Sequence, residues 1–153
     1  MKKSMLFILL LVILTVFGSG EEEKLLQADV SIKPIWLSKG QEGRVVIEFE
    51  IEEGVTINPQ PSFIIEFNPI EEVIFPKNFF TASDIEIKTL EEEGKEFLDL
   101  KEEIEIPFSI NLEAGPGKHI IEGKIQYFAC SNDEEWCIKT STKFKATFYV
   151  RRK

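Results

Sequence analysis

The sequence predicts an all-β domain, because apolar and polar residues alternate along most of its length with the period of two that half-buried strands show. Helical periodicity is nearly absent, and breaks that contain Gly, Pro or Asn separate the alternating segments. In the clearest segment, 103–112, one side of an extended chain carries Ile104, Ile106, Phe108, Ile110 and Leu112. These observations favour an immunoglobulin-like antiparallel β-sandwich of about seven strands, with a small barrel as the alternative.

Several short segments carry this strand pattern. They are residues 28–35, 45–51, 62–67, 84–88, 103–112, 118–129 and 144–150. Pro107 falls on the polar side of its segment, where its missing N–H predicts a sheet edge or a bulge. Residues 91–101 are the least strand-like stretch and are predicted to form a solvated loop, whereas Trp36 is predicted to lie in the core.

The first twenty residues have the pattern of an export signal. Lys2 and Lys3 provide a positive start, residues 5–17 form a thirteen-residue run that is apolar except for Thr15, and small residues follow it. Because a bilayer span needs about 20 apolar residues, an uncleaved signal is the only membrane attachment expected. The prediction is a signal peptide over residues 1–20, a short acidic segment over 21–27 and one immunoglobulin-like domain over 28–153. The protein is expected in the periplasm or outside the cell.

The charge and the histidine count exclude several classes of function. The formal net charge is −9, and it falls to −11 when Lys2 and Lys3 leave with the signal, so a nucleic-acid partner is not expected. His119 is the single histidine and is predicted to begin a strand. A histidine-containing catalytic triad or a histidine-based metal site is therefore not expected. The acidic clusters lack the spacing of a calcium loop. No metal and no cofactor are predicted.

Cys130 and Cys137 are the only cysteines, and an exported chain with an even number of cysteines is expected to join them in a disulfide. Six residues separate them, so the bridge is local. Closing so short a loop restricts the unfolded chain by only about 2.5 kcal/mol on the entropy model. Two interpretations follow: a bridge that only pins a hairpin, or a pair that cycles between disulfide and dithiol.

The residues around the pair predict how accessible it is. Alternation along the preceding strand places Tyr127 on the apolar face and Cys130 on the polar face, where a partner thiol can reach its sulfur. Phe128 and Trp136 are large enough to cover the bond. The acidic residues 133–135 disfavour a nearby thiolate and therefore predict slow uncatalysed exchange.

The segment Ile-Gln-Tyr-Phe-Ala-Cys at residues 125–130, followed by Cys137, resembles the N-terminal periplasmic domain of the thiol:disulfide interchange protein DsbD family. In that family a strand ending in Tyr-Gln-Ala-Cys or Tyr-Gln-Gly-Cys leads into a short loop with a second cysteine. The upstream order is also similar, with the turn at 54–59, the Phe-Pro-Lys step at 75–77 and the apolar-Pro strand at 105–110.

This resemblance implies an immunoglobulin-like fold and a redox relay. Cys130 and Cys137 would be the redox pair, and Cys137 would be the sulfur that forms the mixed disulfide. A shielding cap loop would lie between Pro76 and Leu100. The candidate shielding aromatics are Phe79, Phe80, Phe97, Tyr127, Phe128 and Trp136.

The resemblance also implies the class of partner. Electrons would come from a thioredoxin-like or membrane electron-transfer protein and pass to exported disulfide proteins. Because the sequence holds neither of the family's other domains, the relay needs a separate partner. The alternative function is a non-enzymatic immunoglobulin-like binding module whose disulfide is structural.

Overall fold

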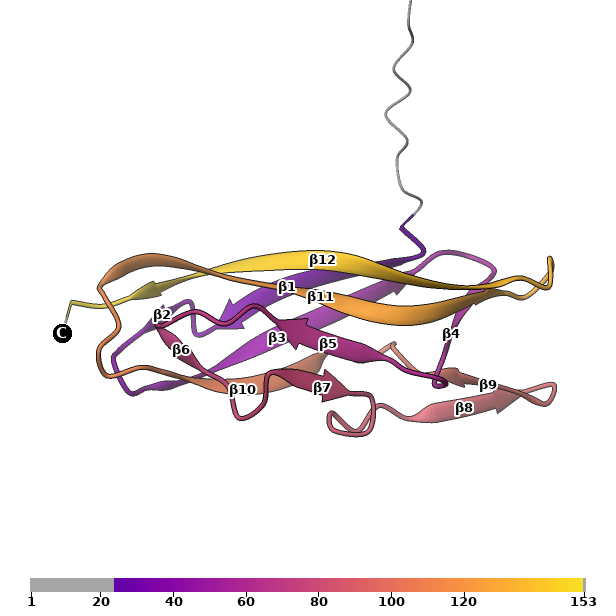
Figure 1. The fold of residues 1–153 in the computed structure, drawn as a ribbon, viewed down its shortest axis with the longest axis horizontal. Helices are drawn as coiled ribbons and strands as arrows, with labels where there is room; N and C mark the ends of the chain where they lie inside the picture. Colours follow the sequence, from indigo (N-terminus) through magenta and orange to yellow (C-terminus); the bar gives the residue numbers. More distant parts are fainter. Residues whose placement is uncertain (1–23, 153) are drawn as a thin grey trace, which may run out of the picture.

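The structure is a computed structural model that describes residues 24–152, so the predicted signal peptide at residues 1–20 lies outside the described residues. In the described part every regular element is a strand, and two sheets face each other across one apolar core (Figure 1). The predicted all-β fold is confirmed, and its curled sheets are compatible with an immunoglobulin-like sandwich.

The four-stranded sheet has the order β1–β3–β10–β6 and contains β1 (Leu26–Lys33), β3 (Glu42–Ile51), β10 (Ile104–Ile110) and β6 (Val73–Ile74). The six-stranded sheet has the order β2–β12–β11–β5–β7, and β4 pairs with β11 beside this path. Its strands are β2 (Trp36–Leu37), β4 (Val55–Asn58), β5 (Ile64–Phe67), β7 (Phe79–Thr81), β11 (Gly117–Ser131) and β12 (Cys137–Val150). A separate hairpin joins β8 (Thr89–Glu92) to β9 (Lys95–Leu98). All recorded pairs are antiparallel except β2 with β12.

The alternation read from the sequence places the apolar side chains between the two sheets. The four-stranded sheet contributes Val45, Ile47, Ile106, Phe108 and Ile110, and the six-stranded sheet contributes Ile65, Ile121, Ile125, Tyr127, Phe144 and Phe148. All of these side chains are buried. Since burying one large apolar side chain stabilises a fold by roughly 1.5–3 kcal/mol, the period of two selects which face of each strand turns inward.

The prediction of about seven strands was low, because the described residues contain twelve. The additional strands have only two to four residues each, too short for an alternating pattern to stand out. The predicted strand 28–35 begins earlier, at Leu26, and ends at Lys33. Pro107 lies in the part of β10 that β6 does not pair, which agrees with the predicted sheet edge.

The strand predicted at 84–88 is wrong, because this segment is a turn. The Asp84 carboxylate accepts hydrogen bonds from the backbone N–H and the hydroxyl of Thr81, and the backbone N–H of Glu86 donates to Ser83. Ile85 and Ile87 are half-buried against the core, so their spacing resembles that of a strand. Local side-chain hydrogen bonds thus replace a sheet ladder here.

The loop predicted at 91–101 is also wrong, because this stretch contains part of β8 and all of β9. Glu93 and Gly94, the two residues between the strands, both have positive φ angles, of 52° and 76°. Two-residue hairpin turns of this kind match the natural twist of the strands. The segment was predicted to be a solvated loop because it is rich in glutamate, and the turn was therefore not recognised from the sequence.

Two apolar residues predicted to face inward are exposed. Leu112 is 73% exposed because β10 ends at Ile110 and Asn111 turns the chain, its side-chain amide donating to the carbonyl of Glu71. Trp36 is 48% exposed, because β2 is the edge strand next to β12 and the indole stacks on Tyr149 at 4.7 Å between ring centroids.

No helix long and apolar enough to cross a bilayer occurs among residues 24–152.

Candidate functional site

Cys130 and Cys137 lie directly opposite each other in the ladder between β11 and β12 and form the predicted disulfide. Their Cα atoms are 4.1 Å apart, the short spacing of a cross-strand pair that exchanges no backbone hydrogen bonds. The next pair along the hairpin is joined by a hydrogen bond from the Ser131 N–H to the Trp136 carbonyl. The bridge therefore closes the far end of the two longest strands (Figure 1).

The two halves of the bridge differ in exposure. The ladder runs without a bulge from Gly117 to Cys130, so Ala129 faces the core and Cys130 faces outward, as the alternation predicted. However, Cys130 is only 9% exposed, whereas Cys137 is exposed. The expectation that a partner thiol reaches Cys130 is therefore wrong, and the accessible residue of the pair is Cys137.

The strand β4 covers the open edge of β11 beside Cys130. Thr56 is the ladder partner of Cys130, and Asn58 is the partner of Phe128. Ile57 lies between them and is fully buried in the core, so Thr56 and Asn58 turn to the outer face. Sequence reasoning missed this contribution, because four residues are too few to show a strand pattern and only the tertiary fold places β4 next to β11.

Hydrogen bonds fix the shape of the loop between the cysteines. The Ser131 hydroxyl accepts from the backbone N–H groups of Asp133 and Glu134, and the Asn132 N–H donates to the carbonyl of Gly54 in the β3–β4 turn. Glu135 has a positive φ of 55°. The loop is therefore tied both to itself and to the neighbouring strand connection, which limits how far the bridge can move.

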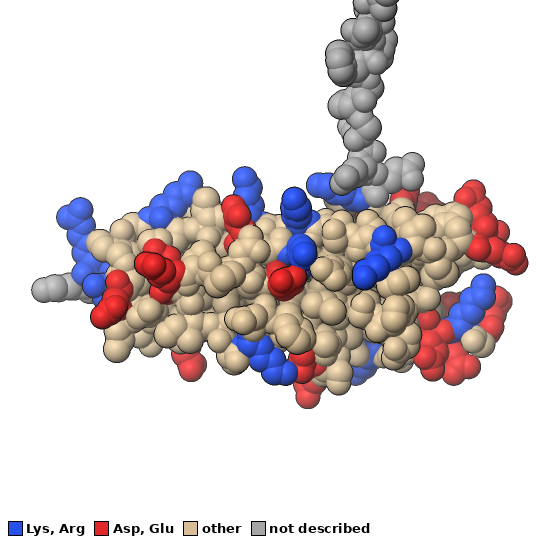
Figure 2. All heavy atoms as spheres, viewed as in Figure 1, with Lys and Arg blue, Asp and Glu red and all other residues tan. Residues whose placement is uncertain are grey.

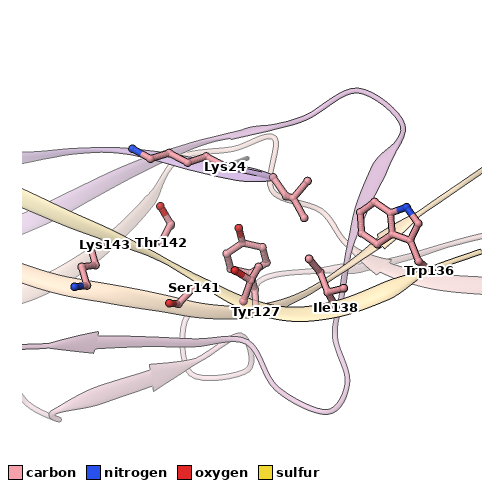
Figure 3. Close-up of a pocket in the computed structure, with 9 residues that line it drawn as sticks. Lys24, Tyr127, Trp136, Ile138, Ser141, Thr142 and Lys143 are labelled. Carbon is pink, nitrogen blue, oxygen red and sulfur yellow. The ribbon is translucent and has the colours of Figure 1, made fainter. Parts of the chain in front are cut away.

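Trp136 lies on the face opposite the bridge. It packs against the core and lines a pocket of about 880 Å³ together with Leu25, Tyr127 and Ile138. Figure 3 shows the Tyr127, Ile138 and Trp136 side chains directed to the same side of β12. Because side chains alternate along a strand, Cys137 points to the other side, and Phe128 is the shielding candidate that shares its face.

The Tyr127 hydroxyl accepts a hydrogen bond from the backbone N–H of Leu26, at 3.2 Å. Burial raises the pKa of the Tyr127 phenol, and the hydrogen bond from Leu26 acts in the opposite direction. The protonated, uncharged phenol of Tyr127 therefore links the two sheets, three positions before Cys130 in β11.

The other predicted shielding residues lie in different places. Phe80 is buried and Phe79 is 52% exposed, and both belong to β7, which pairs with β5 two strands away from β12. Phe97 of β9 lines a cavity of about 250 Å³ that Thr56 of β4 also lines. Of the candidates between Pro76 and Leu100, Phe97 is thus the one beside the strand that covers Cys130.

Acidic side chains gather at the end of the molecule that carries the bridge. Figure 2 shows them in two groups at that end, near the β11–β12 loop and the β8–β9 hairpin in Figure 1. The loop contributes residues 133–135, and the hairpin contributes exposed glutamates such as Glu91 and Glu96. One of these carboxylates is held in place, because the indole N–H of Trp136 donates to Oε2 of Glu134 at 3.0 Å.

His119 lies at the opposite end of the hairpin from the cysteines. It is paired with Phe148 in the ladder, and its Nε2 lies 2.6 Å from the carbonyl oxygen of Gly115. His119 and Cys130 are eleven positions apart along β11, about 36 Å at the rise of a strand. Among residues 24–152, no three metal-ligating side chains cluster in a metal-binding geometry.

No protein-family model and no curated protein matches this chain. Among solved structures, the N-terminal periplasmic domain of ScsB from Proteus mirabilis is similar at 12% identity and a TM-score of 0.40, over 78% of this chain and 44% of that chain. The cohesin–dockerin complex Coh-OlpA-Doc918 from Clostridium thermocellum gives 13% identity and a TM-score of 0.40, over 81% of this chain and 99% of that chain. A conjugative transposon lipoprotein from Bacteroides eggerthii is similar at 12% identity and a TM-score of 0.34, over 78% of this chain and 96% of that chain.

The chain spans less than half of the ScsB structure that it matches. These similarities are distant, and none of them assigns a function to this chain.

Proposed function

We propose that this protein is an exported thiol:disulfide exchange module in which Cys130 and Cys137 are the reacting pair. The observation that carries the proposal is the asymmetry of the bridge: it lies on the outer face of a hairpin end, with Cys137 exposed and Cys130 only 9% exposed. Such a bond presents one sulfur to an incoming thiolate and keeps the other as the leaving group. The Tyr-Phe-Ala-Cys strand end, which resembles the DsbD family, supports the same function.

The proposed reaction proceeds through a mixed disulfide. A partner thiolate attacks Sγ of Cys137, the bond to Cys130 breaks, and Cys130 leaves with the bonding electron pair and takes a proton from water. The second thiolate of the partner then attacks the partner's own sulfur in the mixed disulfide and releases Cys137 as a thiolate. Two electrons thereby pass from the partner dithiol to the pair, and the reverse sequence passes them to an exported disulfide protein.

The proposed partners follow from this chemistry. The electron donor is a thioredoxin-like or membrane electron-transfer protein, and the acceptors are exported disulfide proteins. The predicted signal at residues 1–20 supports a location in the periplasm or outside the cell, where disulfides persist.

The equilibrium reduction potential of the purified protein in a series of thiol redox buffers tests the proposal. We expect a value between about −120 and −270 mV, the range of known exchange proteins. A value below about −300 mV means a structural bond and supports the binding-module alternative.

Two single variants test the assignment of the attacked sulfur. Cys130→Ser leaves the exposed Cys137 thiol. This thiol should form a stable mixed disulfide with a thioredoxin-like partner whose resolving cysteine is replaced by Ser and whose remaining cysteine carries a thionitrobenzoate leaving group. Cys137→Ser leaves only the shielded Cys130 and should trap the same partner at least about tenfold more slowly, because access limits thiol exchange. Equal trapping by both variants would contradict the assignment of Cys137.

A further inference from the structure

The outer face around the bridge carries a lysine next to the exposed cysteine. Lys139 follows Cys137 by two residues in β12, so both side chains point to the same face, about 7 Å apart along the strand. The ladder partner of Lys139 is Phe128, and the partner of Cys137 is Cys130. Lys139 is exposed, and no ion pair recorded among residues 24–152 engages it. Its ammonium is therefore free to approach Sγ of Cys137.

Directly beside the pair, the neighbouring strands contribute no charge to this face, and the nearest charge on β11 is Lys124, six positions from Cys130. Thr56 and Asn58 of β4 and Gln126 and Phe128 of β11 are uncharged, and they are the outward-facing residues beside the pair. Within the described part of the chain, Lys139 is therefore the cation closest to Cys137 along these strands.

Opposing charges come from the loop, from the β3–β4 turn and, at the same end of the molecule, from the β8–β9 hairpin. The loop carries Asp133, Glu134 and Glu135, and the turn carries Glu52 and Glu53. Glu134 is drawn toward Trp136 by the hydrogen bond from the indole, and Trp136 lies on the opposite face. Part of the acidic charge is thus held away from the cysteine, whereas Lys139 shares its face.

We infer that Lys139 stabilises the thiolate of Cys137, so that the proposed exchange reaction depends on this side chain. The inference rests on the proposed function for its physiological meaning. When Cys137 is the leaving group of a mixed disulfide, a nearby cation speeds its release, and when Cys137 is the attacking thiol, the cation increases the thiolate fraction near neutral pH. Lys139 acts through the sulfur of Cys137 and is therefore a positioning residue, not a catalytic one.

The expected size of the effect follows from Coulomb's law. A unit charge about 6 Å from the sulfur at the protein surface changes a pKa by roughly half a unit to one unit. The reaction rate of the thiol at pH 7 should change about three- to tenfold in consequence. The effect should shrink in 1 M salt, where the screening length is only about 3 Å.

The experiment measures the pH profile of iodoacetamide alkylation of Cys137 in the full chain that carries Cys130→Ser. In this background, Lys139→Gln should raise the apparent pKa of Cys137 and slow alkylation at pH 7 about three- to tenfold. Lys139→Arg should restore both values, because it keeps the charge. Lys143→Gln is the matched control: Lys143 faces the same side of β12 two alternations further from Cys137, and its loss should leave the profile unchanged.

The outcomes separate this inference from the proposed function. If Lys139→Gln and Lys143→Gln give the same pH profile, the role of Lys139 is overturned. This result leaves the proposed function standing as long as reduced thioredoxin still reduces the disulfide of the unaltered protein. If the unaltered protein is not reduced by thioredoxin, the proposed function fails, and the alkylation profile still decides whether Lys139 stabilises the thiolate. A shift with Lys139→Gln that Lys139→Arg does not restore also overturns the inference, because it indicates altered packing instead of charge.

Discussion

The phenol oxygen of Tyr127 in β11 accepts a hydrogen bond from the backbone N–H of Leu26 in β1, at 3.2 Å and across 101 positions of sequence. Tyr127 is 2% exposed and Leu26 is fully buried, so the bond joins the two sheets inside the sandwich. It also connects the strand that carries Cys130 to the first strand of the domain.

Tyr127→Phe should lower the free energy of unfolding by about 1–3 kcal/mol, because it leaves the Leu26 N–H buried without a partner. Chemical denaturation of the oxidised protein measures this change. Tyr149→Phe is the control, since the Tyr149 ring stacks on Trp36 and the substitution keeps that ring. Equal losses for the two variants would argue against the bond between the sheets.

The protein should lose stability in alkali through the same residue. Burial raises the pKa of Tyr127 above the ordinary value of 10.0, so the folded state favours the protonated phenol. The contribution is complete below pH 10 and declines as the pH rises from 10 through the folded-state pKa. Denaturation midpoints measured between pH 8 and about 11 should fall more steeply for the unaltered protein than for Tyr127→Phe.

Gly123→Ala should destabilise the domain by about 1–3 kcal/mol through overpacking. A Cβ atom at Gly123 would clash with the carbonyl oxygen of Glu66 in the neighbouring strand and would lie 2.5 Å from the Phe144 ring. The thermal midpoint should fall accordingly, whereas Gly115→Ala, where a Cβ meets nothing within 4 Å, should change it little. An unchanged midpoint for Gly123→Ala would show that β5 and β11 can separate locally.

Removing the bridge should leave the fold intact. The Cys130→Ser, Cys137→Ser double variant should lose roughly 2–3 kcal/mol of unfolding free energy, because the closed loop is short. The ladder between β11 and β12 and the hydrogen bond from Ser131 to Trp136 remain to hold the hairpin. The circular dichroism spectrum should therefore stay that of a β protein, and a random-coil spectrum would contradict this.

The turn at Asp84 should respond to acid. The Lys77 ammonium, which donates to the Asp84 carboxylate, and the Thr81 hydrogen bonds lower the pKa of Asp84 from 3.8 to about 2. The stabilising contribution of the ionised carboxylate is present above pH 3.8 and is lost as the pH falls toward 2. An NMR titration should show this pKa, and Lys77→Met should move it back toward 3.8; a pKa that stays put would exclude Lys77 as the main cause.

Alternation was enough to predict the long strands, and it failed where local contacts compete with it. The patterns along β3, β10 and β12 each identified the buried face, because one face of every long strand meets the core. Residues 84–88 show a similar alternation, but the Asp84 carboxylate stabilises a turn there instead. The β8–β9 hairpin was missed because its turn uses Glu93 and Gly94, and the surrounding glutamates resemble a solvated loop.

At the candidate site, too, some features could be predicted from the sequence and others could not. The sequence by itself determined the disulfide between Cys130 and Cys137 and the outward direction of Cys130, because both follow from local spacing and strand parity. Only the tertiary structure decided which cysteine is accessible and which aromatic residue shares its face. The physical reason is that exposure depends on neighbours distant in sequence. Thr56 of β4, seventy-four positions away, lies beside Cys130, whereas β2 pairs with β12 only at Tyr149 and Val150, far from Cys137.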